Sequence, residues 1–496
     1  MEFTSYTSNF LDIAEEASVM FCFKNEKSNS SLLEKIDILT DGTVFKMYKS
    51  GEFSGDAGDI VMLRHVPETA SGKVILAGLG DEKSVTLDDF RKAAGRIGKL
   101  ALSHKIRSIG FYYDGNEVNP RTSAIVEGFV LGSYKYLNYK TDEKSKNTGI
   151  DSMAIVVPRK NQLRQAEVGL ARGEIISESV CNCRDLVNLP GNALYPESYA
   201  KEAAKLAKKY KFKCRILNES DIKKEKMGAL LSVSQGSDKG PRFVVLEYNG
   251  KAKAKPVVLI GKGVTFDSGG ISLKPGLNMG EMKGDMTGSA VVLNVITAAA
   301  RLQAKINLVV LMPLVENMPS GKATRPGDIV TSRAGLTIEV INTDAEGRMI
   351  LADAIDYAKK FDPQAVIDIA TLTGAAQYIL GYAGAPFVGT NQKLNDNLRQ
   401  SAELTGERIW ELPLWEDFTK IMKSPIADLH NSGGRQAGTL TAASFLKQFT
   451  GDWPWAHIDI AYCDVEPKGL PYIPVGPTGF GVRLLLETIM RWKKVS

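Results

Sequence analysis

A group of ionisable side chains occupies segment 342–348, which reads NTDAEGR. Asp344, Glu346 and Arg348 follow one another at intervals of two residues, directly after an apolar, β-prone run at 336–341. In an extended segment, side chains two residues apart point to the same side, on the order of 7 Å from each other. We therefore expect two carboxylates and one guanidinium to face a common point at the end of a strand.

Segment 261–270 (GKGVTFDSGG) also follows an apolar run, 256–260. It carries Lys262 and Asp267, and the Ser-Gly-Gly that follows the aspartate predicts a sharp turn with positive φ angles. Asp285 comes later in the chain, just before a helical pattern. These ionisable residues again lie where a buried strand meets a loop, and unpaired charges there are expensive to desolvate.

Carboxylates gathered in such a place need cations. A site built from Asp267, Asp285, Asp344 and Glu346 would be formally neutral with two divalent metals and self-repelling with none. Two metals roughly 3.5 to 4 Å apart lower the pKa of a bridging water and polarise an electrophile, which is a device for hydrolysis. Oxygen ligands suit Mg, Mn or Zn. Spacing alone does not establish that acids from three separate segments converge.

Two lysines flank Asp267. Lys262 lies between two glycines, and Lys274 precedes a proline that disfavours helix. Such lysines are ordinarily counter-ions or solvent-exposed, but beside this many carboxylates metal binding is an equal alternative. It requires the neutral amine, so the metal would have to depress a pKa of about 10.4.

Composition narrows the classes of protein. A chain of 496 residues with 44% hydrophobic and 24% charged residues is typical of a globular protein with two domains. The net charge of +5 is too mild to require nucleic acid or an acidic membrane as partner. The longest apolar run, 306–315, is short of the roughly 18 to 20 residues that span a bilayer, so we expect no membrane association.

The N-terminus lacks a basic start followed by an apolar stretch, so a secretory signal is not expected. Five scattered cysteines argue for a reducing compartment, and hence for the cytoplasm. Four histidines, none close to another, disfavour an HExxH zinc protease. No GxSxG sequence supports a serine nucleophile.

Strand-like and helix-like segments alternate along the chain, which predicts an α/β fold. We expect a smaller N-terminal α/β domain (1–160), a linker helix (161–190) and a larger catalytic domain (191–496) with a mixed sheet covered by helices. Residues 139–150 are polar and predict an exposed loop. Ligands in such folds gather at the carboxyl ends of the strands. The expected strands are 72–77, 108–113, 153–157, 214–217, 243–248, 256–260, 306–313, 337–341 and 365–370, and the expected helices are 86–104, 162–186, 198–210, 219–227, 288–302 and 349–360.

At these residues the chain resembles the leucyl aminopeptidase family of dinuclear metallopeptidases, which includes cytosol aminopeptidases and bacterial aminopeptidase A. Segment 342–348 is similar to the family signature, and 261–275 to its other metal-binding segment. The resemblance is specific from about residue 165 to 490 and weak before that. Further similar stretches are 184–190, 282–286, 370–375 and 433–439.

The resemblance implies a ligand set for two divalent ions, Mn or Zn, with Mg as a third option. One metal would be held by Asp267, Asp344 and Glu346. The other would be held by Lys262, Asp267, Asp285 and Glu346, so that Asp267 and Glu346 bridge the pair.

The resemblance also implies a reaction. The free α-amine of a peptide would bind one metal and the scissile carbonyl the other, and a bridging water would attack. Lys274 would stabilise the oxyanion, and Arg348 would hold a bicarbonate ion that acts as general base. The enzyme would then remove N-terminal residues, preferably leucine and other bulky apolar ones.

Family members assemble as hexamers, so a homohexamer acting on peptides is implied. Some bacterial relatives bind DNA, so a DNA-binding architectural or regulatory protein with incidental peptidase activity is the alternative, although no long basic run supports it. A dinuclear phosphohydrolase is a third reading. The positions that resemble residues lining the family's substrate cleft are Met282, Asn342, Ala345, Thr371, Leu372 and Gly374.

Overall fold

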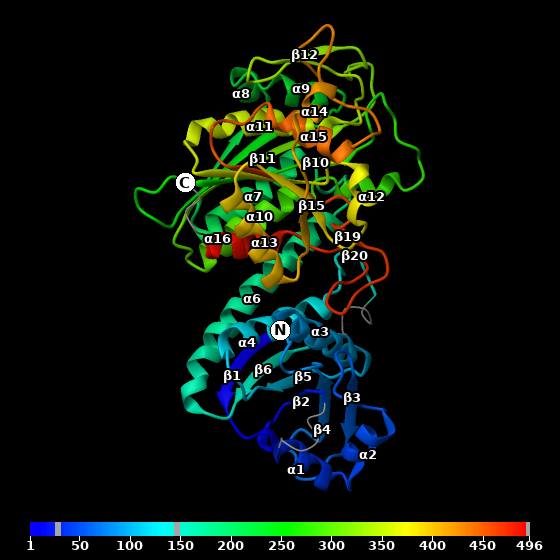
Figure 1. The fold of residues 1–496 in the computed structure, drawn as a ribbon, viewed down its shortest axis with the longest axis vertical. Helices are drawn as coiled ribbons and strands as arrows, with labels where there is room; N and C mark the ends of the chain where they lie inside the picture. Colours follow the sequence, from blue (N-terminus) through cyan, green and yellow to red (C-terminus); the bar gives the residue numbers. More distant parts are fainter. Residues whose placement is uncertain (25–30, 143–148, 493–496) are drawn as a thin grey trace. The chain divides into compact units, whose positions relative to one another are not determined.

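The computed structural model describes residues 1–24, 31–142 and 149–492. The chain divides into two compact units, each drawn in Figure 1. Unit 1 comprises Met1–Glu178 with Lys468–Val475, and unit 2 comprises Ser179–Pro467 with Gly476–Ser496. The division falls inside the long helix α6 (Lys160–Asn188), where the sequence led us to expect a linker over 161–190.

Unit 1 is built on a six-stranded sheet in the order β1-β6-β5-β2-β4-β3. All neighbouring strands in it are parallel except β3 and β4, which are antiparallel. The expected strands at 72–77, 108–113 and 153–157 are confirmed as β4, β5 and β6. The strands are β1 (Glu2–Thr7), β2 (Ala17–Cys22), β3 (Ile60–Arg64), β4 (Lys73–Gly78), β5 (Ser108–Tyr112) and β6 (Ser152–Val157).

The helices of unit 1 are α1 (Ser31–Leu39), α2 (Thr43–Ser50), α3 (Leu87–Ser103) and α4 (Val118–Gly132). Helix α3 starts at a capping box in which Thr86 and Asp89 satisfy each other's backbone amides. It packs tightly on α4 because Gly128 has no side chain. A Cβ atom at that position would lie 2.2 Å from the carbonyl oxygen of Arg91. Of the loop expected at 139–150, residues 143–148 lie outside the described residues.

Unit 2 contains a nine-stranded mixed sheet in the order β16-β15-β18-β14-β9-β11-β8-β7, with β10 also paired to β11. Strands β9, β10, β11, β14 and β18 are linked by parallel pairings. The strands are β7 (Lys213–Leu217), β8 (Arg242–Asn249), β9 (Val257–Gly261), β10 (Gly263–Asp267), β11 (Asn307–Asn317), β14 (Ala365–Ala370), β15 (Ala385–Gly389), β16 (Ile409–Glu411) and β18 (Trp455–Asp459).

Helices cover both faces of this sheet, as Figure 1 shows. Helix α10 contacts strands β9, β11 and β14 together with α7 and α16, whereas α11 contacts β9 and β11 together with α9 and α15. This arrangement confirms the expected mixed sheet between helical layers. The helices are α7 (Pro196–Tyr210), α8 (Glu219–Lys224), α9 (Gly228–Ser234), α10 (Thr287–Arg301), α11 (Glu346–Tyr357), α12 (Gln377–Leu380), α13 (Gln392–Thr405), α14 (Glu416–Ile421), α15 (Gly438–Lys447) and α16 (Val482–Met490).

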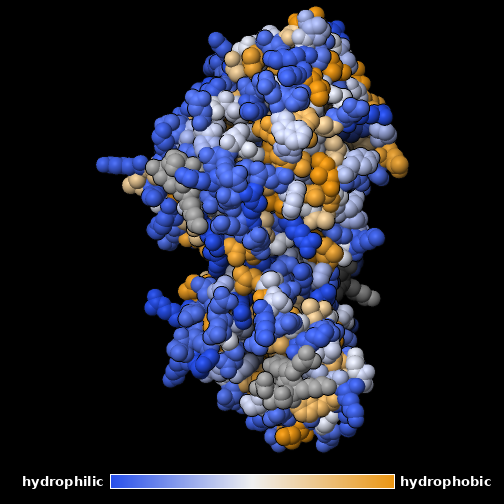
Figure 2. Space-filling model, in the orientation of Figure 1, coloured by the Kyte–Doolittle hydropathy of each residue, from blue (hydrophilic) through white to orange (hydrophobic). Residues whose placement is uncertain are grey.

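The face drawn in Figure 2 is mostly hydrophilic, with smaller groups of hydrophobic residues between. Within the described part of the chain, no helix combines the length and apolarity needed to cross a membrane.

The expectations for two strands of unit 2 are wrong in detail. The run at 336–341 does not enter the large sheet, because β13 (Thr337–Glu339) pairs with β12 (Ile329–Thr331) and β17 (Leu429–His430) in a separate small sheet. The strand expected at 306–313 continues to Asn317, and residues 314, 315 and 317 of this extension are buried. A further two-stranded sheet consists of β19 (Val465–Glu466) and β20 (Gly476–Pro477).

Parallel strands bring their carboxyl ends to one edge of the large sheet. Lys262 follows β9, Asp267 ends β10, Asn317 ends β11, and Asp459 ends β18. The loop that starts at Thr371 follows β14 at the same edge. Residues from five separate segments are thereby collected at the place where this class of sheet binds its ligands.

Candidate active site

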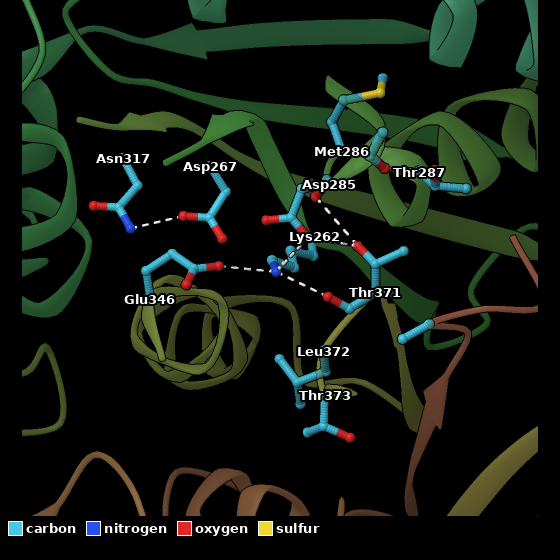
Figure 3. A network of polar contacts seen from close by, with 12 residues as sticks. Lys262, Asp267, Asp285, Met286, Thr287, Asn317, Glu346, Thr371, Leu372 and Thr373 are labelled. Atoms are coloured by element: carbon cyan, nitrogen blue, oxygen red, sulfur yellow. Dashed lines mark hydrogen bonds and ion pairs between the residues drawn. The ribbon is translucent and has the colours of Figure 1, made fainter. Parts of the chain in front are cut away.

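Lys262 lies at the centre of the polar network in Figure 3. Its Nζ atom is 2.6 Å from Oδ1 of Asp285 and 2.9 Å from Oε1 of Glu346. It also donates a hydrogen bond of 2.8 Å to the carbonyl oxygen of Thr371, whose hydroxyl donates to Asp285. The side chain of Lys262 is 3% exposed. The lysine, which follows β9, therefore contacts three other segments. These are the segment before α10 (Asp285), the start of α11 (Glu346) and the loop after β14 (Thr371).

A second lysine holds the other side of the cluster. The Nζ atom of Lys274 lies 2.8 Å from Oδ2 of Asp267 and 2.5 Å from Oδ1 of Asp344. Oδ1 of Asp267 accepts hydrogen bonds from the side chain of Asn317 and the backbone N–H of Gly269. Asp267 is therefore fixed on both oxygens, by a cation on one and by amide donors on the other.

The predicted turn after Asp267 is confirmed. Gly269 and Gly270 have φ angles of 87° and 65°, in the region that favours glycine. The turn brings the backbone N–H of Lys274 within 2.9 Å of the carbonyl oxygen of Ser268. The loop thus folds back, so that Lys274 reaches the aspartate it follows in the chain.

The expectation that 344–348 is extended is wrong. Helix α11 begins at Glu346, so Glu346 and Arg348 lie in its first turn rather than on one side of a strand. Asp344 nevertheless faces Glu346, because the chain turns just before the helix. Arg348 is buried, and its Nε and Nη1 atoms have no hydrogen-bond partner among the described residues. Burial lowers the pKa of Arg348 to about 10 although Glu346 and Asp459 act against this.

The arrangement fits a pair of metal ions. One carboxylate oxygen from each of Asp267, Asp344 and Glu346 lies within 4.8 Å of the other two. Oδ2 of Asp285 is buried and has no hydrogen-bond partner among the described residues, which is costly unless a cation binds it. Four carboxylates and two lysines leave a net negative charge in a buried place. Divalent cations held by these oxygens would balance that charge.

The pKa values express the same imbalance. Burial and repulsion from Glu346 raise the pKa of Asp267 to about 6, although Lys274 and Lys262 lower it. Burial raises the pKa of Asp285 well above its usual value. Burial alone would lower the pKa of Lys262, but the surrounding carboxylates outweigh it and raise the pKa. Without metal, the cluster therefore keeps protons that metal binding would release.

A cavity of about 570 Å³ opens beside the cluster. The predicted metal and basic residues line this cavity, except Arg348, which lies two residues after Glu346 in α11. Of the residues expected to line the substrate cleft, four border this cavity and two, Asn342 and Ala345, are not among its lining residues. The four are Met282, Thr371, Leu372 and Gly374.

Sequence reasoning missed several polar residues that support the site, among them Asp459, which holds the loop that follows β14. Oδ1 of Asp459 accepts hydrogen bonds from the backbone N–H groups of Leu372 and Thr373, and Oδ2 accepts one of 2.6 Å from the hydroxyl of Thr373. Asn317 was missed because its strand was expected to end four residues earlier. Asp464, Tyr382 and Tyr462 also border the cavity.

Comparison with known proteins relates this site to one family. The model of the cytosol aminopeptidase family catalytic domain matches residues 181–486, and that of its N-terminal domain matches residues 19–143. A probable cytosol aminopeptidase of Geobacter sp. (strain M21) is 41% identical over 98% of this chain and 99% of its own. One from Geobacter sulfurreducens is 42% identical, covering 95% of each chain.

Solved structures agree. A mutant of tomato leucine aminopeptidase superimposes with a TM-score of 0.87 at 31% identity, covering 99% of this chain and 96% of that one. The bottromycin maturation enzyme BotP in complex with Mn gives 0.85 at 31% identity, covering 96% of this chain and 99% of that one. Taken with the geometry at the carboxyl ends of the strands, these matches show that the chain belongs to the cytosol aminopeptidase family and is a metal-dependent aminopeptidase.

Proposed function

We propose that the enzyme binds two divalent metals, Mn or Zn and less favourably Mg, and removes the N-terminal residue of peptides. One metal would be held by Asp267, Asp344 and Glu346. The other would be held by Lys262 with Asp285, sharing Asp267 and Glu346. The observation that carries the proposal is the convergence of these five side chains from separate segments into one buried cluster. The Mn in the BotP complex supports this choice of metal.

When bound, the metals would activate a water molecule and polarise the scissile carbonyl. The chain itself supplies the remaining positive charge. The Nζ atom of Lys274 borders the cavity and lies against Asp267 and Asp344, so a peptide carbonyl that reaches the carboxylates also reaches this ammonium. Lys274 would stabilise negative charge on that oxygen in the transition state.

Arg348 is proposed to hold bicarbonate. A buried guanidinium with two unpartnered nitrogens within the described residues favours a small anion with several acceptor oxygens. Arg348 would hold this anion, and bicarbonate bound there would supply general-base chemistry. This role would explain a peptidase with no histidine among the described residues that line its cavity.

The substrate would lie in the cavity with its first side chain against Met282, Thr371 and Gly374. Asn342, Ala345 and Leu372 are proposed to belong to the rest of the substrate cleft, as the family resemblance implies. The family resemblance favours leucine and other bulky apolar first residues. No observation on the described residues favours DNA or phosphate esters as the substrate.

A homohexamer and a cytoplasmic location complete the proposal. Exposed apolar residues of unit 2, such as Trp410 and Trp415, suit an interface between copies. No disulfide joins the cysteines of the described chain, as expected in a reducing compartment. Light scattering on the purified protein measures the assembly, and any mass other than six chains rejects the hexamer.

The function is tested by hydrolysis of leucine 4-nitroanilide before chelation, after chelation, and after Mn or Zn is restored. We expect activity to disappear with the metal and to return with it. The variant Asp344→Ala should remain inactive after metal is restored, whereas Asp417→Ala, at an exposed position on α14, is the matched control. Full activity in the chelated enzyme would reject the proposal.

A further inference from the structure

Asp464 is a buried acid in the substrate cavity that the proposed reaction does not use. It is 7% exposed and borders the cavity. A Cβ atom on Gly284 would lie 3.9 Å from Oδ2 of Asp464, so the carboxylate lies beside the residue that precedes Asp285. Gly284 itself borders the cavity and has no side chain to cover the carboxylate.

No cation of the chain balances this carboxylate, because Asp464 forms no ion pair within the described residues. The polar groups that favour its charged form are neutral, the hydroxyl of Thr287 and the backbone of Tyr462, while the carboxylate of Asp459 repels it. A methyl group of Val187 lies beside Gly284. Burial outweighs these donors and raises the pKa of Asp464 to about 7. A buried carboxylate in this condition is stabilised by any cation that can reach it.

Two tyrosines at the same cavity add a second, independent observation. The rings of Tyr382 and Tyr462 lie 6.0 Å apart at 78° to each other, and both residues border the cavity. Tyr462 has a φ angle of 73°, a conformation that bulky residues rarely adopt. Such strain persists where the surroundings require it and is concentrated at ligand sites. Aromatic faces attract ammonium and guanidinium groups.

We propose that this part of the cavity, formed by Asp464, Tyr382 and Tyr462, binds the side chain of an N-terminal lysine or arginine. The inference rests on the proposed peptidase function and names a substrate class for it. The cavity wall at Met282 would pack against the methylene groups of such a side chain, and its charged end would reach Asp464. Leucine would bind the same wall but would leave the carboxylate without a counter-ion.

The test compares lysine 4-nitroanilide with norleucine 4-nitroanilide, which has a similar chain without the ammonium group. The wild-type enzyme should hydrolyse the lysine substrate with a kcat/KM at least equal to that for norleucine. In Asp464→Asn the lysine-to-norleucine ratio should fall about tenfold, the effect of roughly one charged hydrogen bond. Glu281→Gln, which alters an exposed acid at the cavity rim, should change the ratio much less.

A fall of less than about threefold in Asp464→Asn, or an equal fall in Glu281→Gln, overturns the inference. Calorimetry provides a measurement that does not require turnover: chelated wild-type enzyme should bind lysinamide more tightly than norleucinamide, and Asp464→Asn should not. If neither anilide is hydrolysed, the peptidase proposal fails, while the calorimetric preference still decides whether the pocket recognises a cation. Equal binding of the two amides to the wild-type enzyme contradicts the pocket.

Discussion

Gly347 leaves the space that the side chain of Lys262 occupies. A Cβ atom on Gly347 would lie 2.5 Å from Cε of Lys262 and 2.8 Å from its Nζ, well inside van der Waals contact. The glycine between Glu346 and Arg348 therefore lets the first turn of α11 approach the loop after β9. This contact explains why a residue that weakens helices stands in the first turn of this one.

The first prediction follows from this contact. Gly347→Ala should favour helix by up to about 1 kcal/mol but push Lys262 away from Asp285 and Glu346. We expect the variant to fold and to bind metal at least tenfold more weakly, measured by competition with a chelator. Gly321→Ala is the control, because no atom lies within 4 Å of a Cβ there. Equal metal affinity in wild type and Gly347→Ala would show that Lys262 is not a ligand.

A second prediction concerns Arg348. Replacing it with methionine should leave metal binding intact, because the guanidinium makes no ion pair with the predicted ligands in the described structure. Turnover should fall by about 10²- to 10⁴-fold, as expected when a general base is lost. Added bicarbonate should accelerate the wild-type enzyme after dialysis and have no effect on Arg348→Met. If added bicarbonate still accelerates Arg348→Met, the anion does not bind at Arg348.

A third prediction concerns the support beneath the cavity. Asp459→Asn keeps the size of the side chain but removes an acceptor for the loop at 372–373. Loss of a charged hydrogen bond is worth about 1.5 to 3 kcal/mol, so kcat/KM should fall on the order of tenfold or more. The metal content should stay that of the wild type, which separates positioning of the loop from loss of the cluster. The exposed Asp452→Asn is the control. A wild-type kcat/KM would contradict the role given to Asp459.

A fourth prediction concerns pH and stability. Asp353 in α11 is buried and accepts hydrogen bonds from the backbone N–H groups of Leu230 and Arg333. Burial is the larger effect and raises its pKa to about 7, against about 3.9 in an unfolded chain. The folded state therefore holds a proton that the unfolded state has lost between these values, and stability from this group decreases as pH rises toward 7.

The melting temperature measures this effect. The melting temperature of the wild type minus that of Asp353→Asn should decrease as pH rises from 5 to 8. The asparagine side chain has no proton to lose, so only the wild type is destabilised through this group. The exposed Asp417→Asn should show no such trend relative to wild type. A difference that stays constant with pH, or that moves in favour of the wild type, would contradict a raised pKa at Asp353.

The sequence predicted much of the site because its chemistry is local. The positive φ angles after Asp267 follow from two consecutive glycines, and the acids at 344–346 follow an apolar run. The predicted helix at 349–360 was shifted, because Glu346 already forms the first turn of α11. An alternating pattern of acids does not distinguish a strand end from a helix start, and only tertiary contacts with Lys262 decide between them.

The residues that sequence reasoning missed are polar groups buried by distant partners. Strand β18 contains His457 and Asp459, which a pattern of hydrophobicity assigns to the surface. In the structure His457 lies 2.5 Å from Asp368 in the neighbouring strand, and Asp459 caps loop amides more than 80 residues away in the chain. Their burial is favourable only because these partners exist, so no local pattern reveals it.

The most direct measurement is the metal content of the purified protein. After equilibration with Mn or Zn and removal of free ions, elemental analysis should find two divalent ions per chain in the wild type. A variant with Asp344 and Glu346 both replaced by alanine should lose both sites, because Glu346 is proposed to be shared between them. Fewer than two ions in the wild type, or two ions in that variant, would contradict a dinuclear cluster built from these side chains.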